Sequence, residues 1–487
     1  MRVSFGNLQD IVTGIFYSHS AVVDLNFNFG EATKSISKFL RPHVGFDEVK
    51  NFRLEGNGSP ATLAAFLTRM HEQFHYSQLI TTPLGVLQFR LLQCIVSQIS
   101  LLTLCITKAG KRRVPIPLIE AYDEWRRHSD LSQELLADFD REIERLSTLI
   151  QFWMALMGRE SLSMTQFVQL ANHAFQILAT ISGVPLRCKW SAHSPNLGSY
   201  LPDHQISTTE IMEAQARLYE FNILSSLALK NSDSITWQSA SVIGLYRPAF
   251  EYCMSRLNDQ QTSFVALDVS LSSPIDVVQA ADAPEVIFVE EILPSWRMGK
   301  IVDCLLDTSW PSNEQDALNE VKNGLANRAG IPTPEDACLL AEVDVLWQWR
   351  PGNSFGLMYE YVESQFRIGM GLRAHGSCFP AGALTAMLGK TELKTMWPLV
   401  EIFSDRILFP PGLKPDFAGK VAYQTLSNLA RSLAAISILG TGDVRQLTAI
   451  EAKLNSYAME YGIRNVFDFR EVIEMTFGAE LMNQLLW

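Results

Sequence analysis

A short stretch of the chain places residues that bind metal ions at the spacing of one helical turn. His71 and His75 lie four residues apart within Met70–Tyr76, and Glu72 directly follows the first histidine. On a helix, residues four apart share a face, so the two imidazoles can bind one zinc ion together. Glu72 points to a neighbouring face, where its carboxylate can serve as general base on a water molecule that the metal activates. The stretch therefore predicts a zinc site with a coordination position left for chemistry.

The residues before this motif predict the helix that it requires. Ser59 is a preferred N-cap residue, and Pro60 suits the first helical position. Apolar residues then recur at steps of three and four, namely Leu63, Phe66, Leu67, Met70 and Phe74. This periodicity is typical of an amphipathic helix and places both histidines at the edge of the apolar stripe. The alternative interpretation is a pair of polar histidines on a half-buried helix that binds no metal.

The motif resembles the active-site helix of the zincin superfamily of zinc metallopeptidases, which carries His-Glu-x-x-His. The longer string from His71 to Gln78, followed by Thr81–Gly85, also resembles a set of bacterial proteins with an HExxH-aromatic-x-Gln pattern. Together the two likenesses cover residues 59–85. The metzincin subgroup does not fit, because its pattern needs Gly and a third His where this chain has Gln78 and Thr81.

A second predicted helix offers the third metal ligand. Ser207-Thr208-Thr209-Glu210 matches the capping box, so Glu210 already has a role at the helix start. In zincins of the gluzincin type the third ligand is a Glu on a later helix, and Glu213 resembles that arrangement. The alternative for Glu213 is an ion pair with Arg217 on the helix surface. Rival third ligands remain open, and they are His173, His204, Asp203 and Glu160.

The resemblance implies a zinc-dependent metallopeptidase that cleaves a peptide or protein substrate, with Glu72 as general base and Zn²⁺ as cofactor. Candidate donors to the oxyanion are Tyr246 and His204, with Arg247 and Tyr200 as alternatives that the sequence does not rank. A regulatory protein partner is a further expectation. The alternatives are a zinc hydrolase acting on a non-peptide amide, and a helical protein-interaction scaffold in which the motif is structural or degenerate.

Composition indicates which kinds of binding partner and which cellular compartment to expect. The formal net charge is −12, which disfavours nucleic-acid binding because that binding depends on Lys and Arg neutralising phosphates. Seven scattered cysteines without a C-x-x-C pair predict reduced thiols in a cytoplasmic protein. The apolar stretch 91–107 contains several polar residues and falls short of the roughly 20 apolar residues that span a membrane. No membrane segment is therefore expected.

These patterns predict a mainly α (α+β) fold with a zincin-like catalytic core, a small N-terminal β-sheet, large helical insertions and a helical C-terminal region. We predict an N-terminal mixed segment at 1–58, a catalytic region at 59–257 and a C-terminal domain at 258–487. Residues 23–29 alternate in the manner of a half-buried strand, and Asn51–Leu54 is a second candidate strand. The stretch 258–285 is expected to be a domain junction containing a strand or two, for example at Phe264–Leu267.

Overall fold

The computed structural model describes the parts of the chain that carry the candidate site. They are residues 14–18, 20–28, 60–108, 118–127, 132–158, 162–182, 189–192, 206–226, 247–272, 286–289, 293–306, 324–325, 327–330, 333–340, 356–374 and, with gaps, 398–432. These residues are mostly helical and include a small sheet, which confirms the mainly α class with a minor β component.

The motif helix, α3, runs from Pro60 to Thr81 and begins at the predicted proline. It is followed by α4 (Pro83–Lys108), and the chain turns by 93° between the segments Leu67–Thr81 and Pro83–Ile99. Among the described residues no single helix is long and apolar enough to cross a membrane, although this bent pair reaches that length and composition together. Both helices belong to the main hydrophobic cluster, which contains Leu79 and Phe89.

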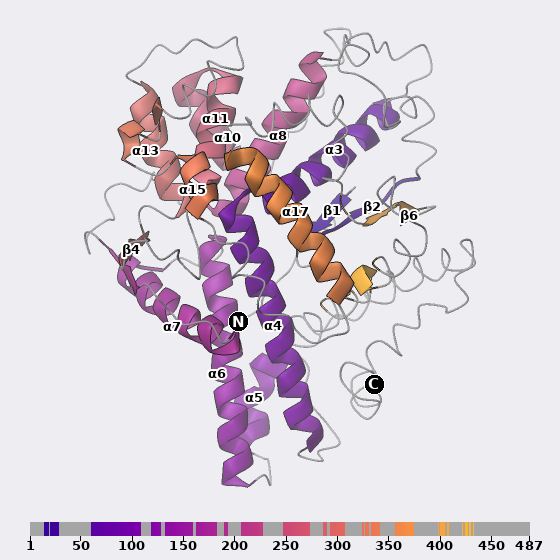
Figure 1. The fold of residues 1–487 in the computed structure, drawn as a ribbon, viewed down its shortest axis with the longest axis vertical. Helices are drawn as coiled ribbons and strands as arrows, with labels where there is room; N and C mark the ends of the chain where they lie inside the picture. Colours follow the sequence, from indigo (N-terminus) through magenta and orange to yellow (C-terminus); the bar gives the residue numbers. More distant parts are fainter. Residues whose placement is uncertain are drawn as a thin grey trace.

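Two groups of helices surround this bend (Figure 1). The first group lies alongside α4 in the lower half of the view and consists of α5 (Leu118–Arg127), α6 (Gln133–Leu156) and α7 (Met164–Ser182). The second group lies around α3 and consists of α8 (Thr208–Ser226), α10 (Arg247–Leu257), α11 (Gln260–Leu271), α13 (Pro294–Leu306), α15 (Pro334–Leu340) and α17 (Gly356–Ala374). Helices α8 and α17 both pack directly against α3.

One prediction about the second group is wrong, because the stretch expected to hold strands forms helix α11. Asp259 begins this helix as N-cap, with its side chain accepting a hydrogen bond of 2.6 Å from the backbone N–H of Thr262. Phe264–Leu267 are all buried, so the run shows no polar and apolar alternation. A short continuous apolar run fits a buried helix as well as a buried strand, and here the N-cap decides for the helix.

The small sheet joins strands from distant parts of the chain. Its order is β1 (Gly14–Tyr17), β2 (Val22–Leu25), β5 (Val400–Ile402) and β6 (Ile407–Leu408), with only the β2–β5 pair parallel. β2 confirms the strand predicted within 23–29. The small sheet expected at the N-terminus is present, but it is not confined to that region, because β5 and β6 come from residues 400–408. The other candidate strand, Asn51–Leu54, lies outside the described residues.

A second, two-stranded sheet pairs β3 (Lys189–Ser191) in parallel with β4 (Val286–Phe288). The strands lie nearly a hundred residues apart in sequence, on opposite sides of the predicted division at residue 258. The main hydrophobic cluster also crosses this position, since it contains Phe74 of α3, Leu267 of α11 and Phe366 of α17. The described residues on both sides thus share one core, while the division into domains stays a prediction.

Helix α17 approaches the end of α3 so closely that one of its residues must be a glycine. A Cβ atom added at Gly369 would lie 2.4 Å from the backbone oxygen of Ile80, whereas one added at Gly371 meets no atom within 4 Å. Backbone atoms of a packed helix cannot move aside as a flexible side chain can. The contact between the two helices therefore depends on the missing side chain at Gly369.

We predict opposite effects of the same substitution at these two glycines. Gly369→Ala should lower the free energy of unfolding by about 1–3 kcal/mol, because the methyl group forces α17 away from α3. Gly371→Ala should raise it by about 0.5–1 kcal/mol, because alanine is the better helix former and has room. Urea unfolding of both variants beside the unaltered protein checks this. Shifts of the same sign in both variants would contradict the close helix contact.

Candidate metal centre

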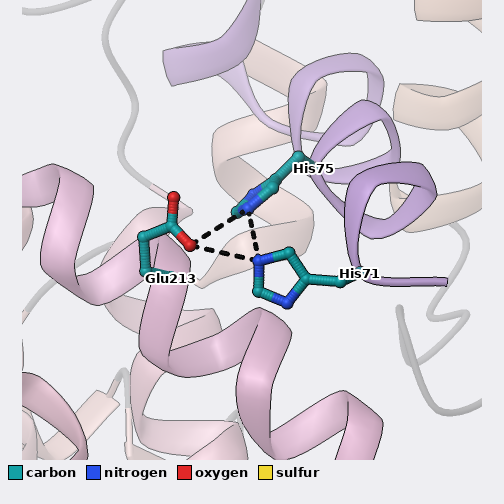
Figure 2. A group of neighbouring side chains, drawn as sticks. All are labelled: His71, His75 and Glu213. Carbon is teal, nitrogen blue, oxygen red and sulfur yellow. Dashed lines mark hydrogen bonds and ion pairs between the residues drawn. The ribbon is translucent and has the colours of Figure 1, made fainter. Parts of the chain in front are cut away.

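Two helices bring three potential metal ligands together. His71 and His75 project from α3, and Glu213 projects from α8 toward both of them (Figure 2). The Nε2 atoms of the two histidines are 3.0 Å apart. Glu213 Oε2 lies 3.1 Å from His71 Nε2 and 3.4 Å from His75 Nε2. The three donor atoms therefore form a compact triangle, as predicted from the motif and from the resemblance.

The chemistry and spacing of this triangle fit a zinc ion. Two imidazole nitrogens and one carboxylate oxygen are a donor set of catalytic zinc sites. Donor atoms about 2.0–2.1 Å from a tetrahedral zinc ion lie about 3.3–3.4 Å from one another. The three separations of 3.0, 3.1 and 3.4 Å are close to that value. Both histidines are buried, and Glu213 is partly exposed.

The capping box predicted at the start of α8 is present and sets the position of Glu213. The backbone N–H of Glu210 donates to Ser207 Oγ at 3.1 Å, and the N–H of Ser207 donates to Glu210 Oε2 at 2.7 Å. The Thr208 hydroxyl also donates to the carbonyl oxygen of Leu156, at the end of α6, at 2.7 Å. The first turn of α8 is thereby attached to α6, and Glu213 follows one turn later on the side that meets α3.

Each histidine uses its other ring nitrogen in a hydrogen bond that leaves Nε2 for a metal. His71 Nδ1 lies 2.7 Å from Glu220 Oε1, and Glu220 also pairs with Arg217. His75 Nδ1 lies 2.8 Å from the amide oxygen of Gln78. A carboxylate or amide oxygen can only accept, so Nδ1 carries the proton in both rings. Histidines that bind metals commonly have such a second partner, which holds the ring orientation.

Without a metal, the charged groups of the site shift one another's pKa values. Burial lowers the pKa of His71, but the hydrogen bonds and negative charges of Glu213 and Glu220 outweigh it and raise that pKa to about 10. Burial likewise lowers the pKa of His75, and Glu213 reverses the effect, so the net shift is upward. Burial raises the pKa of Glu213, but the charge of His75 and the hydrogen bonds from both imidazoles hold it well below its usual range. The carboxylate of Glu213 is thus ready to bind a cation.

Glu72 lies beside the triangle, at the point where the sheet meets α3. A Cβ atom added to Gly14 of β1 would lie 2.8 Å from Glu72 Cγ and 3.1 Å from Glu72 Oε1, so the glycine allows the strand to approach the carboxyl group. Burial raises the pKa of Glu72, and the charges of His71 and His75 lower it in part. A buried carboxyl group with a raised pKa beside a metal site has the properties of a general base.

The other predicted site residues do not join this cluster within the described part of the chain. His173 is an exposed residue of α7, and Arg247 is exposed at the start of α10, where it pairs with Glu251 at 2.8 Å. Arg217, the alternative partner of Glu213, contacts Glu220. Several candidates lie outside the described residues, and they are Tyr246, His204, Tyr200, Asp203 and Glu160.

Sequence reasoning missed two residues that hold the histidines. Glu220 lies seven residues after Glu213, two helical turns along the same face of α8, and this spacing is the signal that could have found it. Gln78 lies three residues after His75 on α3, on the same side of the helix. In both cases the residue type also fits, because each supplies an oxygen that accepts from an imidazole N–H.

Comparison of the chain with protein-family models, with curated proteins and with solved structures found no match. The metal centre is therefore inferred from the geometry of the side chains. Within the described residues, His71, His75 and Glu213 form the one group of three or more His, Cys, Asp or Glu side chains arranged to hold a metal ion.

We predict about one zinc ion per chain in the purified protein. His75→Ala and Glu213→Ala should each lose most of it, because removing one of three ligands leaves a site that holds zinc far more weakly. Elemental analysis of the three proteins, prepared in the same way and reconstituted with zinc, measures the stoichiometry.

His173→Ala is the matched control, because it removes an exposed histidine of α7 and should leave the zinc content unchanged. Zinc retained in Glu213→Ala but lost in His75→Ala would show that another residue supplies the third ligand. A wild-type protein without zinc after reconstitution would contradict the metal centre itself.

Proposed function

We propose that this protein is a zinc-dependent hydrolase that cleaves peptide bonds. The observation that carries the proposal is the group formed by two histidines and a glutamate around one point, with Glu72 beside it on the motif helix. A zinc ion held by these ligands would supply a Lewis acid that activates water and polarises the carbonyl group of the substrate. We further propose that α3, α8 and the sheet make up a zincin-like core.

Glu72 has the position and environment to move the proton in this reaction. Its carboxylate accepts the proton of the attacking water and delivers it to the amine that leaves. Burial raises its pKa, which makes its carboxylate a stronger base than that of an exposed glutamate, and the charges of the two imidazoles offset part of this rise. Glu72 directly follows His71 in the sequence, so it lies near the metal ligands and points to a neighbouring face of the helix.

β1 supports a peptide as the substrate class. It is the first strand in the sheet order, and among the described strands it pairs only with β2, so its other side is an edge. An extended peptide can add to such an edge by main-chain hydrogen bonds. Gly14 brings this strand into contact with Glu72, so a peptide aligned with β1 would pass the general base. A small non-peptide amide would gain nothing from this edge, which favours a peptide.

The general base is tested with Glu72→Gln. This substitution keeps the size and shape of the side chain but removes its basicity, so hydrolysis should fall by about 10²-fold to 10⁴-fold. The zinc content should stay near that of the unaltered protein, because Glu72 is not a ligand. The measurement is hydrolysis of a mixed fluorogenic peptide library by the zinc-loaded proteins, with zinc content determined on the same samples.

Glu124→Gln on the exposed face of α5 is the matched control and should behave like the unaltered protein. Full activity in Glu72→Gln would contradict the role of Glu72. A zinc-loaded protein that cleaves no peptide in the library would favour the non-peptide amide hydrolase, and a protein that binds no zinc would favour the interaction scaffold.

A further inference from the structure

A chain of buried polar side chains extends from His75 through four helices. Gln78 of α3 accepts from His75, and its Nε2 lies 2.8 Å from Gln215 Oε1 on α8. Gln215 Nε2 lies 3.2 Å from Asp268 Oδ1 on α11. Arg373 of α17 completes the chain, with Nη2 at 2.8 Å from both carboxylate oxygens of Asp268. All five side chains are buried. We call Gln78, Gln215, Asp268 and Arg373 the relay.

The end of the relay determines the direction of every hydrogen bond in it. The carboxylate of Asp268, paired with the guanidinium of Arg373, accepts hydrogen bonds, so Gln215 must turn its NH₂ group toward it. The amide oxygen of Gln215 then faces Gln78, which must donate. The NH₂ group of Gln78 also donates to the backbone oxygen of Met212 at 3.1 Å, and this second acceptor selects the same amide orientation.

The amide oxygen of Gln78 is therefore left facing His75. It can only accept, so the proton of the neutral imidazole must sit on Nδ1 and the lone pair on Nε2. Nε2 is the atom that lies 3.4 Å from Glu213 and 3.0 Å from His71 Nε2. The relay thus selects the tautomer in which the ring presents its lone pair to the other two ligands.

The two histidines are held by different means, and the charges explain why. His71 donates directly to the carboxylate of Glu220, whereas His75 donates to a neutral amide. Glu72, Glu213 and Glu220 already place three carboxyl groups around the two imidazoles. A fourth carboxylate at position 78 would add repulsion within a buried site, where charges are poorly screened. The neutral amide of Gln78 orients His75 without adding that charge. The carboxylate that fixes the orientation of the amide belongs to Asp268, which is linked to Gln78 through Gln215.

We propose that Gln78 and Gln215 are positioning residues for His75, with Asp268 and Arg373 fixing their orientation from α11 and α17. This inference rests on the proposed metal site and deepens it. It assigns part of the site to the stretch beyond residue 258, which the sequence placed in another domain. The relay touches neither metal nor substrate, so its contribution is to the affinity and geometry of the metal site.

The test uses the full chain loaded with zinc or with cobalt, whose visible absorption reports ligand geometry. Gln78→Leu removes the acceptor of His75 and should weaken zinc binding by about 10-fold to 100-fold and change the cobalt spectrum. Gln215→Leu leaves every contact of His75 in place, and should weaken zinc binding in the same direction by about fivefold. Competition with a chromophoric chelator gives the dissociation constants.

Gln93→Leu is the matched control, because it also removes a buried glutamine that accepts a hydrogen bond, from Tyr359 Oη at 2.5 Å, but on α4 outside the relay. It should lower the melting temperature without moving the zinc affinity or the cobalt spectrum. Circular dichroism and the melting temperature of each metal-free variant separate loss of fold from loss of affinity. If Gln78→Leu does not fold, Gln215→Leu alone decides.

The outcomes separate the two proposals. Unaltered zinc affinity and cobalt spectra in the relay variants, beside a wild type that binds one zinc, would overturn the role of the relay and leave the metal site standing. Equal weakening in Gln93→Leu and Gln215→Leu would also overturn it, because general destabilisation would then explain both. A wild type that binds neither metal would overturn the metal site and the relay together.

Discussion

The contact between α3 and α8 is the interaction on which the structure of the site depends. There, two imidazoles and two carboxylates meet at separations of 2.7–3.4 Å. Buried ion pairs are poor stabilisers, since replacing them by apolar residues of similar size is often neutral or stabilising by about 1–4 kcal/mol. Four such groups in one place therefore add little to the stability of the fold, which is why the cluster is a candidate for a functional site.

The opposite side of α3 is attached to the sheet by a second set of buried polar contacts. Arg69 and Gln73, one turn apart, both donate to the carboxylate of Glu401 on β5, with Gln73 Nε2 at 2.7 Å, and the guanidinium of Arg69 also lies 5.4 Å from the centre of the Phe403 ring. α17 packs on the end of the same helix at Gly369. The motif helix is therefore held on three sides, by the sheet, by α8 and by α17. This arrangement explains how the two histidines of the motif helix can keep one geometry.

Local signals in the sequence predicted the parts of the site that depend on local geometry. The proline that begins α3, the i,i+4 histidines and the capping box that begins α8 are each decided within a few residues, and each is present in the structure. What the sequence could not reveal depends on contacts between distant segments. The pairing of β2 with β5 joins residues nearly four hundred positions apart, and the sequence of neither strand indicates which strand it pairs with. The strand expected at Phe264–Leu267 was wrong because the local pattern is ambiguous. A run of apolar residues that is buried on every side has no periodicity that distinguishes a helix from a strand.

His75 and Glu213 are separated by 138 positions in the sequence, which is long for two ligands of one ion, but the fold brings them together. α4 leaves the site at the sharp turn after α3, and α6 runs alongside α4 before the chain reaches α8. Thr208 at the start of α8 then donates to the last turn of α6, so the intervening helices end where they must for Glu213 to face α3. Loop-closure entropy grows only slowly with the length of the connecting segment, and here Phe152 and Phe175 of that segment pack within the main hydrophobic cluster. A long connection of this kind costs the site little, provided that its two ends are held together, and the contact between α3 and α8 holds them.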